Sequence, residues 1–401
     1  MDTYPNLYEL RGVSASKSDV HAAIKNLDKG LYPGAFCTIL PDVFTGSEDH
    51  CIIQHADGAG TKAALAYLAW RVYGEMSVWK GIVQDSIVMN LDDMACAGAL
   101  GPFVISMTIG RNKHLIPGEV VTALIEGCRE LCTFFTDLGF PCYLSGGETA
   151  DIGDLVRTIT VDHTVTCRFP RTSVINAGGI TAPALIVGFS STGQAVWENA
   201  PNSGIGSNGF TNARHDTLSP LYRRYAETYA PETDPTLIYR GPHLLPDPLP
   251  EDDRFSVASA LLSPTRAYLP LITRLIRDIE PHHIKGLIHC SGGGQTKIGK
   301  FGSPGIIYVK NNLFPTPPVF QMLRRVSNMS WYDMFQTYNM GHRLEAVVSG
   351  QVVADACIAL ARDCDIEAQV IGEVIQGKNP PGTRSVLIMT PDSGSSYYFK
   401  C

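Results

Sequence analysis

The spacing of apolar residues changes repeatedly along the chain, and this alternation predicts an α/β fold. Short apolar runs typical of buried strands occur at residues 36–40, 51–53, 103–109, 142–144, 159–167, 184–189, 286–290, 346–348 and 386–389. Between them, apolar residues recur every three or four positions, as they do on one face of a helix. These helical runs cover residues 63–70, 80–99, 117–138, 263–276, 318–323, 330–335 and 352–361.

A turn-rich segment at residues 170–182 divides this pattern into two parts. A chain of 401 residues is long enough for two cores, so we expect one domain at 1–170 and a second at 171–401. Within the second, the proline-rich and acidic stretch 227–254 predicts an inserted surface segment. The polar leader at 1–35 is either a flap over a site or a frayed end.

Composition narrows the class of protein. The formal net charge is -7 and the pI is about 5.9, which disfavours a nucleic-acid surface. No apolar run is long enough to predict a membrane span, and the N-terminus does not read as a secretory signal. The 11 cysteines have no zinc-ligand spacing, which favours reduced, buried thiols in a cytoplasmic protein.

The run Asp57-Gly58-Ala59-Gly60-Thr61-Lys62 follows a predicted strand and precedes a predicted helix. Glycines let a backbone approach an anion closely, and a helix start offers unpaired N–H groups. Lys62 offers a positive charge, and Asp57 is a ligand type that Mg²⁺ prefers. The pattern therefore favours a phosphate and metal site, and a tight turn with a capping aspartate is the alternative.

Acidic residues recur at two further places. Asp92 and Asp93 lie in the otherwise apolar helical run 80–99, where unpaired carboxylates are costly, so they face either water or a cation. Gly146-Gly147-Glu148-Thr149 follows the predicted strand 142–144 and repeats the glycine and carboxylate chemistry of the first run.

Two more glycine-rich stretches are candidate ligand loops. Residues 202–210 contain Ser207 and Asn208 ahead of a predicted helix, and they suit an anion or form a surface loop. Gly292, Gly293 and Gly294 follow the predicted strand 286–290, where they admit either a ligand or a neighbouring helix.

Taken in chain order, these motifs resemble the aminoimidazole ribonucleotide synthetase family, also called phosphoribosylformylglycinamidine cyclo-ligase. The run at 57–62 resembles the family's DGVGTK, and Asp92-Asp93 with Gly98, Ala99 and Pro102 resembles its N-D-x-x-x-x-G-A-x-P. Residues 146–151 resemble GGETAEM, and residues 203–210 resemble SGPHSNGY. Residues 263–268, 289–294 and 334–341 resemble APTRIY, H-x-T-G-G-G and MYRTFNCG.

The resemblance implies two α/β domains and a homodimer in which the N-terminal mixed sheets of two subunits pair. It implies ATP, Mg²⁺ and a small ribonucleotide, formylglycinamidine ribonucleotide, whose formyl-amide oxygen is phosphorylated before the amidine nitrogen closes the imidazole ring. No covalent enzyme nucleophile is needed, so positioning and charge neutralisation carry the catalysis.

The resemblance also implies roles for residues. Asp57, Lys62 and Asp93 would be catalytic, and Asp57, Asp93, Asp92 and Glu148 would hold the metal. Nucleotide contacts would come from Gly58, Gly60, Thr61, Asp92, Gly146, Gly147, Glu148 and Thr149. The ribonucleotide would contact Ser207, Asn208, Gly292, Gly293 and Gly294.

The sequence departs from the family mainly on the ribonucleotide side. Gly206 stands where SGPHSNGY has histidine, GVGM becomes Gly341-His342-Arg343-Leu344, Lys300 replaces an arginine, and 14–18 lack the family's D-I-D-A-G. His55 and His342 are possible substitutes for the missing imidazole. Two alternatives therefore stay open: a related phosphotransferase acting on another oxygen acceptor, and a non-catalytic nucleotide-binding relative.

Overall fold

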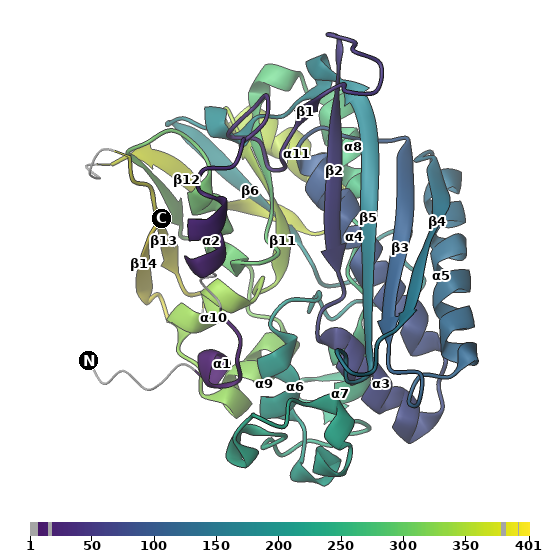
Figure 1. Ribbon diagram of the computed structural model, residues 1–401. Helices are drawn as coiled ribbons and strands as arrows, with labels where there is room; N and C mark the ends of the chain where they lie inside the picture. The colour runs from purple at the N-terminus through teal and green to yellow at the C-terminus, as the bar shows by residue number, and fades with distance from the viewer. Residues whose placement is uncertain (1–6, 15–17, 378–381, 392) are drawn as a thin grey trace.

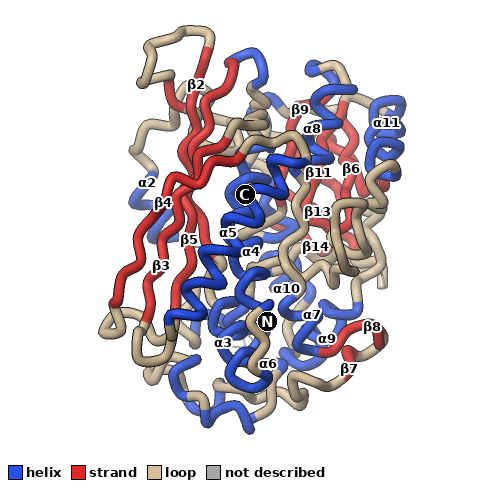
Figure 2. Tube along the Cα trace, turned by 90° about the vertical axis from the view of Figure 1, so that its right-hand side faces the viewer, coloured by secondary structure: helices blue, strands red, loops and turns tan. Residues whose placement is uncertain are grey.

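Two β-sheets, one from each half of the chain, lie side by side in the computed structural model (Figure 1), which describes residues 7–14, 18–377, 382–391 and 393–401. The α/β fold predicted from the apolar pattern is confirmed. In Figure 2 the helices α4 and α5 separate the first sheet from the second. Residues 15–17, within the departure from the family's N-terminal motif, lie outside the described residues.

The first sheet is mixed and has the order β1-β2-β5-β3-β4. Strand β5 is antiparallel to both β2 and β3, whereas β3 and β4 are parallel. Its strands are β1 Leu40–Pro41, β2 His50–Gly58, β3 Phe103–Arg111, β4 Cys142–Asp151 and β5 Ile159–Pro170. The helices of this half are α1 Leu7–Leu10, α2 Ser18–Ile24, α3 Lys62–Tyr73, α4 Ser77–Cys96 and α5 Gly118–Asp137.

The second sheet has the order β14-β13-β10-β12-β6-β11-β9. Its strands are β6 Ala184–Ser190, β9 Ile284–His289, β10 Ile306–Lys310, β11 His342–Val348, β12 Ala368–Gln376, β13 Ser385–Met389 and β14 Ser396–Lys400. The helices of this half are α6 Phe210–Thr217, α7 Val257–Leu262, α8 Leu269–Asp278, α9 Pro318–Ser327, α10 Trp331–Thr337 and α11 Gln351–Arg362. Strands β10, β12 and β14 were not predicted from the apolar pattern.

Helix α4 lies between the two halves of the molecule. It packs against β2, β5 and α5 on one side and against β9 and α8 on the other. Every residue from Asp85 to Cys96 is buried, so the polar ones must find partners inside the protein. Within the part of the chain that the structure describes, neither α4 nor any other helix has the length and apolarity needed to cross a membrane.

Several helices and strands begin or end at other residues than the sequence predicted. Strand β2 continues through Gly58, and β4 continues through the two glycines to Asp151, so neither motif is a loop as expected. The helix predicted from residue 263 begins only at Leu269, since α7 ends at Leu262 and residues 263–268 between the two helices are not helical.

The inserted segment and the leader pack on each other. The insertion contains short turns of 3-10 helix and the hairpin of β7 Pro248–Leu249 and β8 Asp252–Ser256. Arg11 of the leader is buried, donates to both carboxylate oxygens of Asp216 in α6, and donates to the Leu237 carbonyl of the insertion. This part of the leader is therefore anchored by an ion pair, which neither a free flap nor a frayed end would have.

Candidate active site

An acidic corner forms where the end of β2 meets α4. Alternation along β2 places His55 and Asp57 on the face of the sheet that α4 covers. Asp93 of α4 raises the pKa of Asp57 through charge repulsion, in addition to the larger effect of burial. His55 Nε2 lies 3.6 Å from Asp93 Oδ2. Asp57 and Asp93 therefore face the same corner, and their role as metal ligands stays a prediction.

Asp93 is held in its charged form by the Lys297 ammonium and by a hydrogen bond from His289, both in the second half of the molecule. Burial by itself raises the pKa of Asp93, but the Lys297 ammonium and His289 outweigh it and lower that pKa to about 2. His289 Nδ1 lies 2.5 Å from Asp93 Oδ1, and Arg343 donates to His289 Nε2 at 2.8 Å. Burial and Arg343 lower the pKa of His289 to about 4, so it is neutral at pH 7.

Lys297 supplies the positive charge that we expected from Lys62. Its Nζ donates to Ser291 Oγ at 2.7 Å and lies 4.6 Å from the centroid of the Phe36 ring. It lowers the pKa of both Asp57 and Asp93. Sequence reasoning missed this residue, although its position three residues after the triple glycine was the available signal.

Lys62 requires a correction. Its side chain is fully buried, and Nζ donates to Asp85 Oδ1 at 2.9 Å and to the carbonyl oxygens of Gly206 and Ser263 at 2.9 and 2.7 Å. All three ammonium protons are thus used inside the core. Lys62 ties α3 to α4 and to the second half of the chain, in place of the phosphate contact that we expected.

Asp92 also requires a correction. It is fully buried and accepts hydrogen bonds from the backbone N–H groups of Tyr268 and Leu269, at the start of α8. Burial raises the pKa of Asp92 to about 7, although these N–H groups oppose the shift. Both carboxylate oxygens of Asp92 thus accept hydrogen bonds from orphan donors of a helix start, so Asp92 caps α8 inside the protein.

Glu148 lies away from the acidic corner. The pairing of strands places Gly58, Asp162, Thr108 and Glu148 in one row across the sheet. Asp57 precedes this row by one residue, so its side chain points to the opposite face. The two residues are also three strands apart, about 14 Å at ordinary strand spacing. Within one chain, Glu148 and Asp57 do not hold one ion.

In the Gly146-Gly147 motif, Gly147 is needed for the packing of the sheet. A Cβ at position 147 would lie 1.8 Å from the Met107 carbonyl oxygen, beside the irregular pairing of β3 with β4. Together with Glu148 and Thr149 the two glycines line a separate cavity of about 160 Å³ beside α5. These four residues, from which we expected nucleotide contacts, therefore do not lie next to Asp57.

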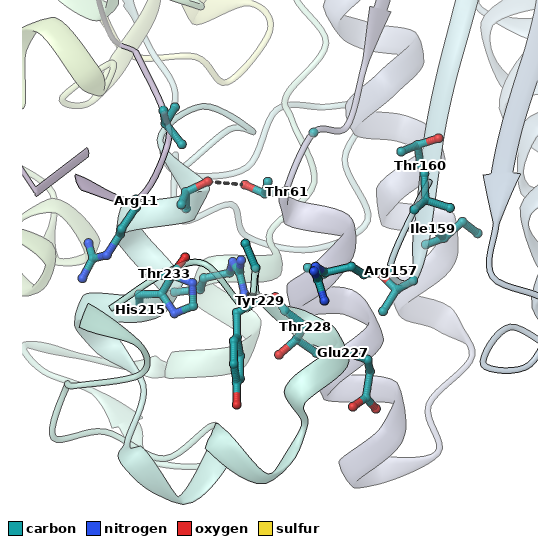
Figure 3. A pocket seen from close by; sticks show the side chains of 18 of the residues that line it. Arg11, Thr61, Arg157, Ile159, Thr160, His215, Glu227, Thr228, Tyr229 and Thr233 are labelled. Carbon is teal, nitrogen blue, oxygen red and sulfur yellow. Dashed lines mark hydrogen bonds between the residues drawn. The ribbon is translucent and has the colours of Figure 1, made fainter. Parts of the chain in front are cut away.

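The turn after β2 borders a larger cavity, drawn in Figure 3. This cavity has a volume of about 420 Å³, and Gly60, Thr61, Arg157 and Tyr229 are among its lining residues. Thr61 Oγ1 lies 3.1 Å from Thr211 Oγ1 of α6. Gly58 is not among the residues that line this cavity, and a Cβ there would lie 1.7 Å from Asp162 Oδ1, so strand packing needs the glycine.

The expected ribonucleotide loops are only partly brought together. Ser207 and Asn208 are half-buried, and the position of a Cβ on Gly292 lies 4.0 Å from Asn208 Nδ2. At Gly294, φ is +50° and a Cβ would lie 2.5 Å from the Tyr338 carbonyl oxygen. Gly294 therefore admits a neighbouring segment, whereas Gly292 faces Asn208 and stays a candidate for ligand contact.

Two departures from the family motifs are explained together. At Gly206, φ is +71°, and a Cβ would lie 3.2 Å from Nε of the buried Arg343 guanidinium. The arginine therefore fills space that a side chain at position 206 would need. His289, which receives a hydrogen bond from Arg343, contacts Asp93, and His55 is a second imidazole beside the same carboxylate.

His342, the other proposed substitute, belongs to a buried cluster in the second sheet. Its Nε2 lies 2.9 Å from Glu345 Oε1, and Lys310 donates to the same carboxylate and to Gln295. Burial alone raises the pKa of Glu345, but Lys310 and His342 outweigh it and lower that pKa to about 2. The cluster is an internal ion pair remote from solvent.

This ion pair predicts an acid-dependent loss of stability. A depressed carboxyl pKa stabilises the fold fully above the unfolded value, and the contribution is lost as pH falls toward about 2. Glu345→Gln is expected to lower the free energy of unfolding at pH 7 by about 2 kcal/mol, since Gln keeps an acceptor but not the charge. Urea unfolding between about pH 2 and 7 should show a shallower pH dependence for the variant. Parallel curves would contradict this assignment.

The chain is similar to known proteins over most of its length. The model of AIR synthase related protein, N-terminal domain, matches residues 37–169, and that of the C-terminal domain matches residues 186–381. A phosphoribosylformylglycinamidine cyclo-ligase of Methanocaldococcus jannaschii is 27% identical over 340 residues, which cover 84% of this chain and 82% of that protein. The chloroplastic protein of the same name in Arabidopsis thaliana is 26% identical over 335 residues, covering 82% and 72%.

Two solved structures share the fold at low identity. A chain of the HypE–HypF complex has a TM-score of 0.54 at 13% identity and covers 96% of this chain and 99% of its own. ThiL complexed with AMPPCP and TMP has a TM-score of 0.52 at 11% identity and covers 99% of both chains. The fold that this chain shares with both structures consists of two α/β halves, each built on one β-sheet. The chain belongs to the AIR synthase related family.

Proposed function

We propose that this protein catalyses the ATP-dependent closure of formylglycinamidine ribonucleotide to aminoimidazole ribonucleotide, a ligase reaction of purine biosynthesis. The family membership and the shared name of the relatives support this reaction. The single observation on which the proposal rests is the meeting of Asp57 and Asp93 at the corner between β2 and α4.

The donor set fits a divalent cation. Two carboxylates that repel each other in a partly buried corner are typical ligands of Mg²⁺ next to phosphate oxygens. Asp57 and Asp93 would hold the ion, and Mg²⁺ would neutralise the phosphate oxygens of ATP when bound. A solved relative in fold is named as a complex with AMPPCP, which supports an ATP-type nucleotide.

The remaining residues position and neutralise charge. Lys297 would contact the transferred phosphate, because its ammonium already stabilises both carboxylates of the corner. His289 and Arg343 would keep Asp93 oriented. Gly60 and Thr61 at the turn after β2, with Ser207, Asn208 and Gly292, would contact the nucleotide and ribonucleotide.

A homodimer in the cytoplasm is part of the same proposal. Val104 and Tyr143 are cross-strand neighbours on the face of the first sheet away from α4, with 46% and 60% of their surfaces exposed. Apolar side chains paired on an open sheet face favour burial against a second copy. Residues 1–170 would then form the nucleotide and dimer domain, and 171–401 the domain on the substrate side.

The test is product formation. Purified protein with ATP and Mg²⁺ should release ADP at least about tenfold faster when formylglycinamidine ribonucleotide is added, a lowering of the barrier by roughly 1.4 kcal/mol or more. Aminoimidazole ribonucleotide should appear in equal amount by chromatography. ATP binding without stimulation would contradict the proposal.

A second function is favoured by one observation. Arg343 and Gly206 differ from the family motifs in the part of the site where those motifs place the ribonucleotide. The acceptor of the phosphoryl group would then be another oxygen compound. The protein would then be a phosphotransferase with the same metal and nucleotide corner. Stimulation of ADP release by other acceptors, but not by formylglycinamidine ribonucleotide, would decide for it. A non-catalytic relative would show neither response.

A further inference from the structure

A short turn before β9 carries three side chains of the kinds that bind metals, away from the acidic corner. Ligand atoms of Glu280, His282 and His283 all lie within 4.8 Å of one another. His283 directly precedes β9, whereas His289, which contacts Asp93, is the last residue of that strand. At about 3.3 Å per residue, His283 and His289 lie roughly 20 Å apart. The group is therefore separate from the proposed active site.

The backbone of this turn is fixed by its own hydrogen bonds. Pro281 begins the 3-10 helix Pro281–His283 and fixes its own φ, and the His283 N–H donates to the Glu280 carbonyl oxygen at 3.0 Å. Ser349, which follows β11, donates its N–H to the His283 carbonyl oxygen at 3.0 Å. Because the turn is ordered in advance, an ion that binds there costs less conformational entropy.

The spacing of the side chains suits a metal ion. His282 Nδ1 lies 3.4 Å from Glu280 Oε2, which is longer than an ordinary hydrogen bond. A tetrahedral Zn²⁺ holds its ligands at about 2.0–2.2 Å, so neighbouring ligand atoms are roughly 3.4 Å apart. The ring centroids of His282 and His283 are 3.9 Å apart, which places a second imidazole beside the first. Among the described residues, Glu280 has no ion-pair partner other than His282.

His283 also has the outer contact that is typical of histidines that bind metals. Its Nδ1 lies 2.8 Å from Ser349 Oγ, and this hydroxyl can donate or accept, so the contact exists with either tautomer. Nε2 is then the ring nitrogen that is open to an ion. A hydrogen bond from the second nitrogen to an oxygen fixes the orientation of the ring when an ion is bound.

We propose that Glu280, His282 and His283 form a surface site for a first-row transition ion such as Zn²⁺ or Co²⁺, with coordination positions left open to solvent. Two imidazoles and one carboxylate are a donor set that such ions prefer, whereas Mg²⁺ prefers oxygen ligands. The side chains of His282 and Glu280 are 67% and 76% exposed, so an ion reaches them without any opening of the fold.

The second such group in the described part of the chain does not carry the same inference. Ligand atoms of Cys290, His342 and Glu345 also lie within 4.8 Å of one another, but all three residues are buried. Lys310 donates to the Glu345 carboxylate. A cation of the protein thus already neutralises the charge that would attract a metal ion there.

The test uses the full-length protein, freed of bound metal, in excess Mg²⁺ and without nucleotide or ribonucleotide. Excess Mg²⁺ occupies sites built from oxygen ligands, among them the proposed corner at Asp57 and Asp93. Co²⁺ is titrated while its visible absorption is recorded, and Zn²⁺ affinity is measured by competition with bound Co²⁺. We expect Co²⁺ to bind and to show the visible bands of nitrogen coordination, in spite of the Mg²⁺.

Three variants examine the ligands and the outer contact. Ser349→Ala removes only the outer contact and should weaken Co²⁺ and Zn²⁺ binding by about tenfold. His282→Asn and His283→Asn each remove a ligand and should weaken binding by more than about tenfold, because losing a ligand costs more than losing its outer partner.

His114→Asn is the matched control, since His114 is also exposed but belongs to neither group of ligands in the described chain. It should leave both affinities unchanged. Unchanged Co²⁺ binding in His282→Asn, an equal loss in His114→Asn, or displacement of Co²⁺ by Mg²⁺ would overturn the proposal. If thermal unfolding shows that His283→Asn does not fold, the exposed His282→Asn decides. Because no nucleotide or ribonucleotide is present, failure of the ring-closure proposal leaves this test intact.

Discussion

Asp57→Asn is expected to reduce ATP turnover by about 1,000-fold while the protein stays folded, because it removes a charge from the proposed metal site. Burial and Asp93 raise the pKa of Asp57, so its charged form destabilises the native state at neutral pH. Asparagine removes that repulsion and keeps the acceptor for the Gly58 N–H, which Asp57 Oδ1 now accepts at 2.7 Å. Stability should therefore be unchanged or higher.

The measurement combines ADP release with urea unfolding. Asp92→Asn is the matched control, since it neutralises the carboxylate next to Asp93 in the chain but keeps an acceptor for the N–H groups at the start of α8. That variant should retain turnover within about threefold, because Asp92 is a helix cap rather than a metal ligand. Equal loss of turnover in both variants would return Asp92 to the metal site. Unchanged turnover in Asp57→Asn would remove Asp57 from it.

Lys62→Met is expected to lower the free energy of unfolding by about 3–5 kcal/mol, because it leaves the buried Asp85 without its cation. Burial lowers the pKa of Lys62 and raises that of Asp85, so each depends on the other to stay charged. Two carbonyl oxygens, those of Gly206 and Ser263, also lose their donor. The α3, α4 and second-half segments would then separate more easily.

Urea unfolding and nucleotide affinity together decide this role. Lys80→Met is the surface control: the Lys80 and Glu130 side chains are 52% and 47% exposed, and its loss should cost less than about 1 kcal/mol. Lys62→Met with Asp85→Asn should recover part of the stability, because the uncompensated charge is gone. If Lys62→Met instead kept its stability and only weakened ATP binding, the phosphate contact first expected for Lys62 would be restored.

Most strands and helices of the first half could be predicted because their apolar spacing is regular, but the strand predicted at 36–40 was wrong, since β1 begins only at Leu40. Strand β5 alternates buried and exposed residues along its whole length, and the predicted helix at 117–138 matches α5 closely. The position of Asp57 and Asp93 together was expected from the family resemblance. The loops predicted around Gly58 and Gly147 were strands, because these glycines admit Asp162 and the Met107 carbonyl, partners distant in sequence.

The sequence by itself determined the α/β class, the order of the motifs and the set of acidic residues that includes the proposed metal ligands. Only the tertiary structure decided that Lys62 and Asp92 are internal partners, and that Lys297 and His289 from the other half face Asp93. The physical reason is that a sequence shows which residue types are present and how they are spaced, but not which of them touch. Whether a charge binds a ligand or another part of the protein depends on contacts between segments far apart in sequence.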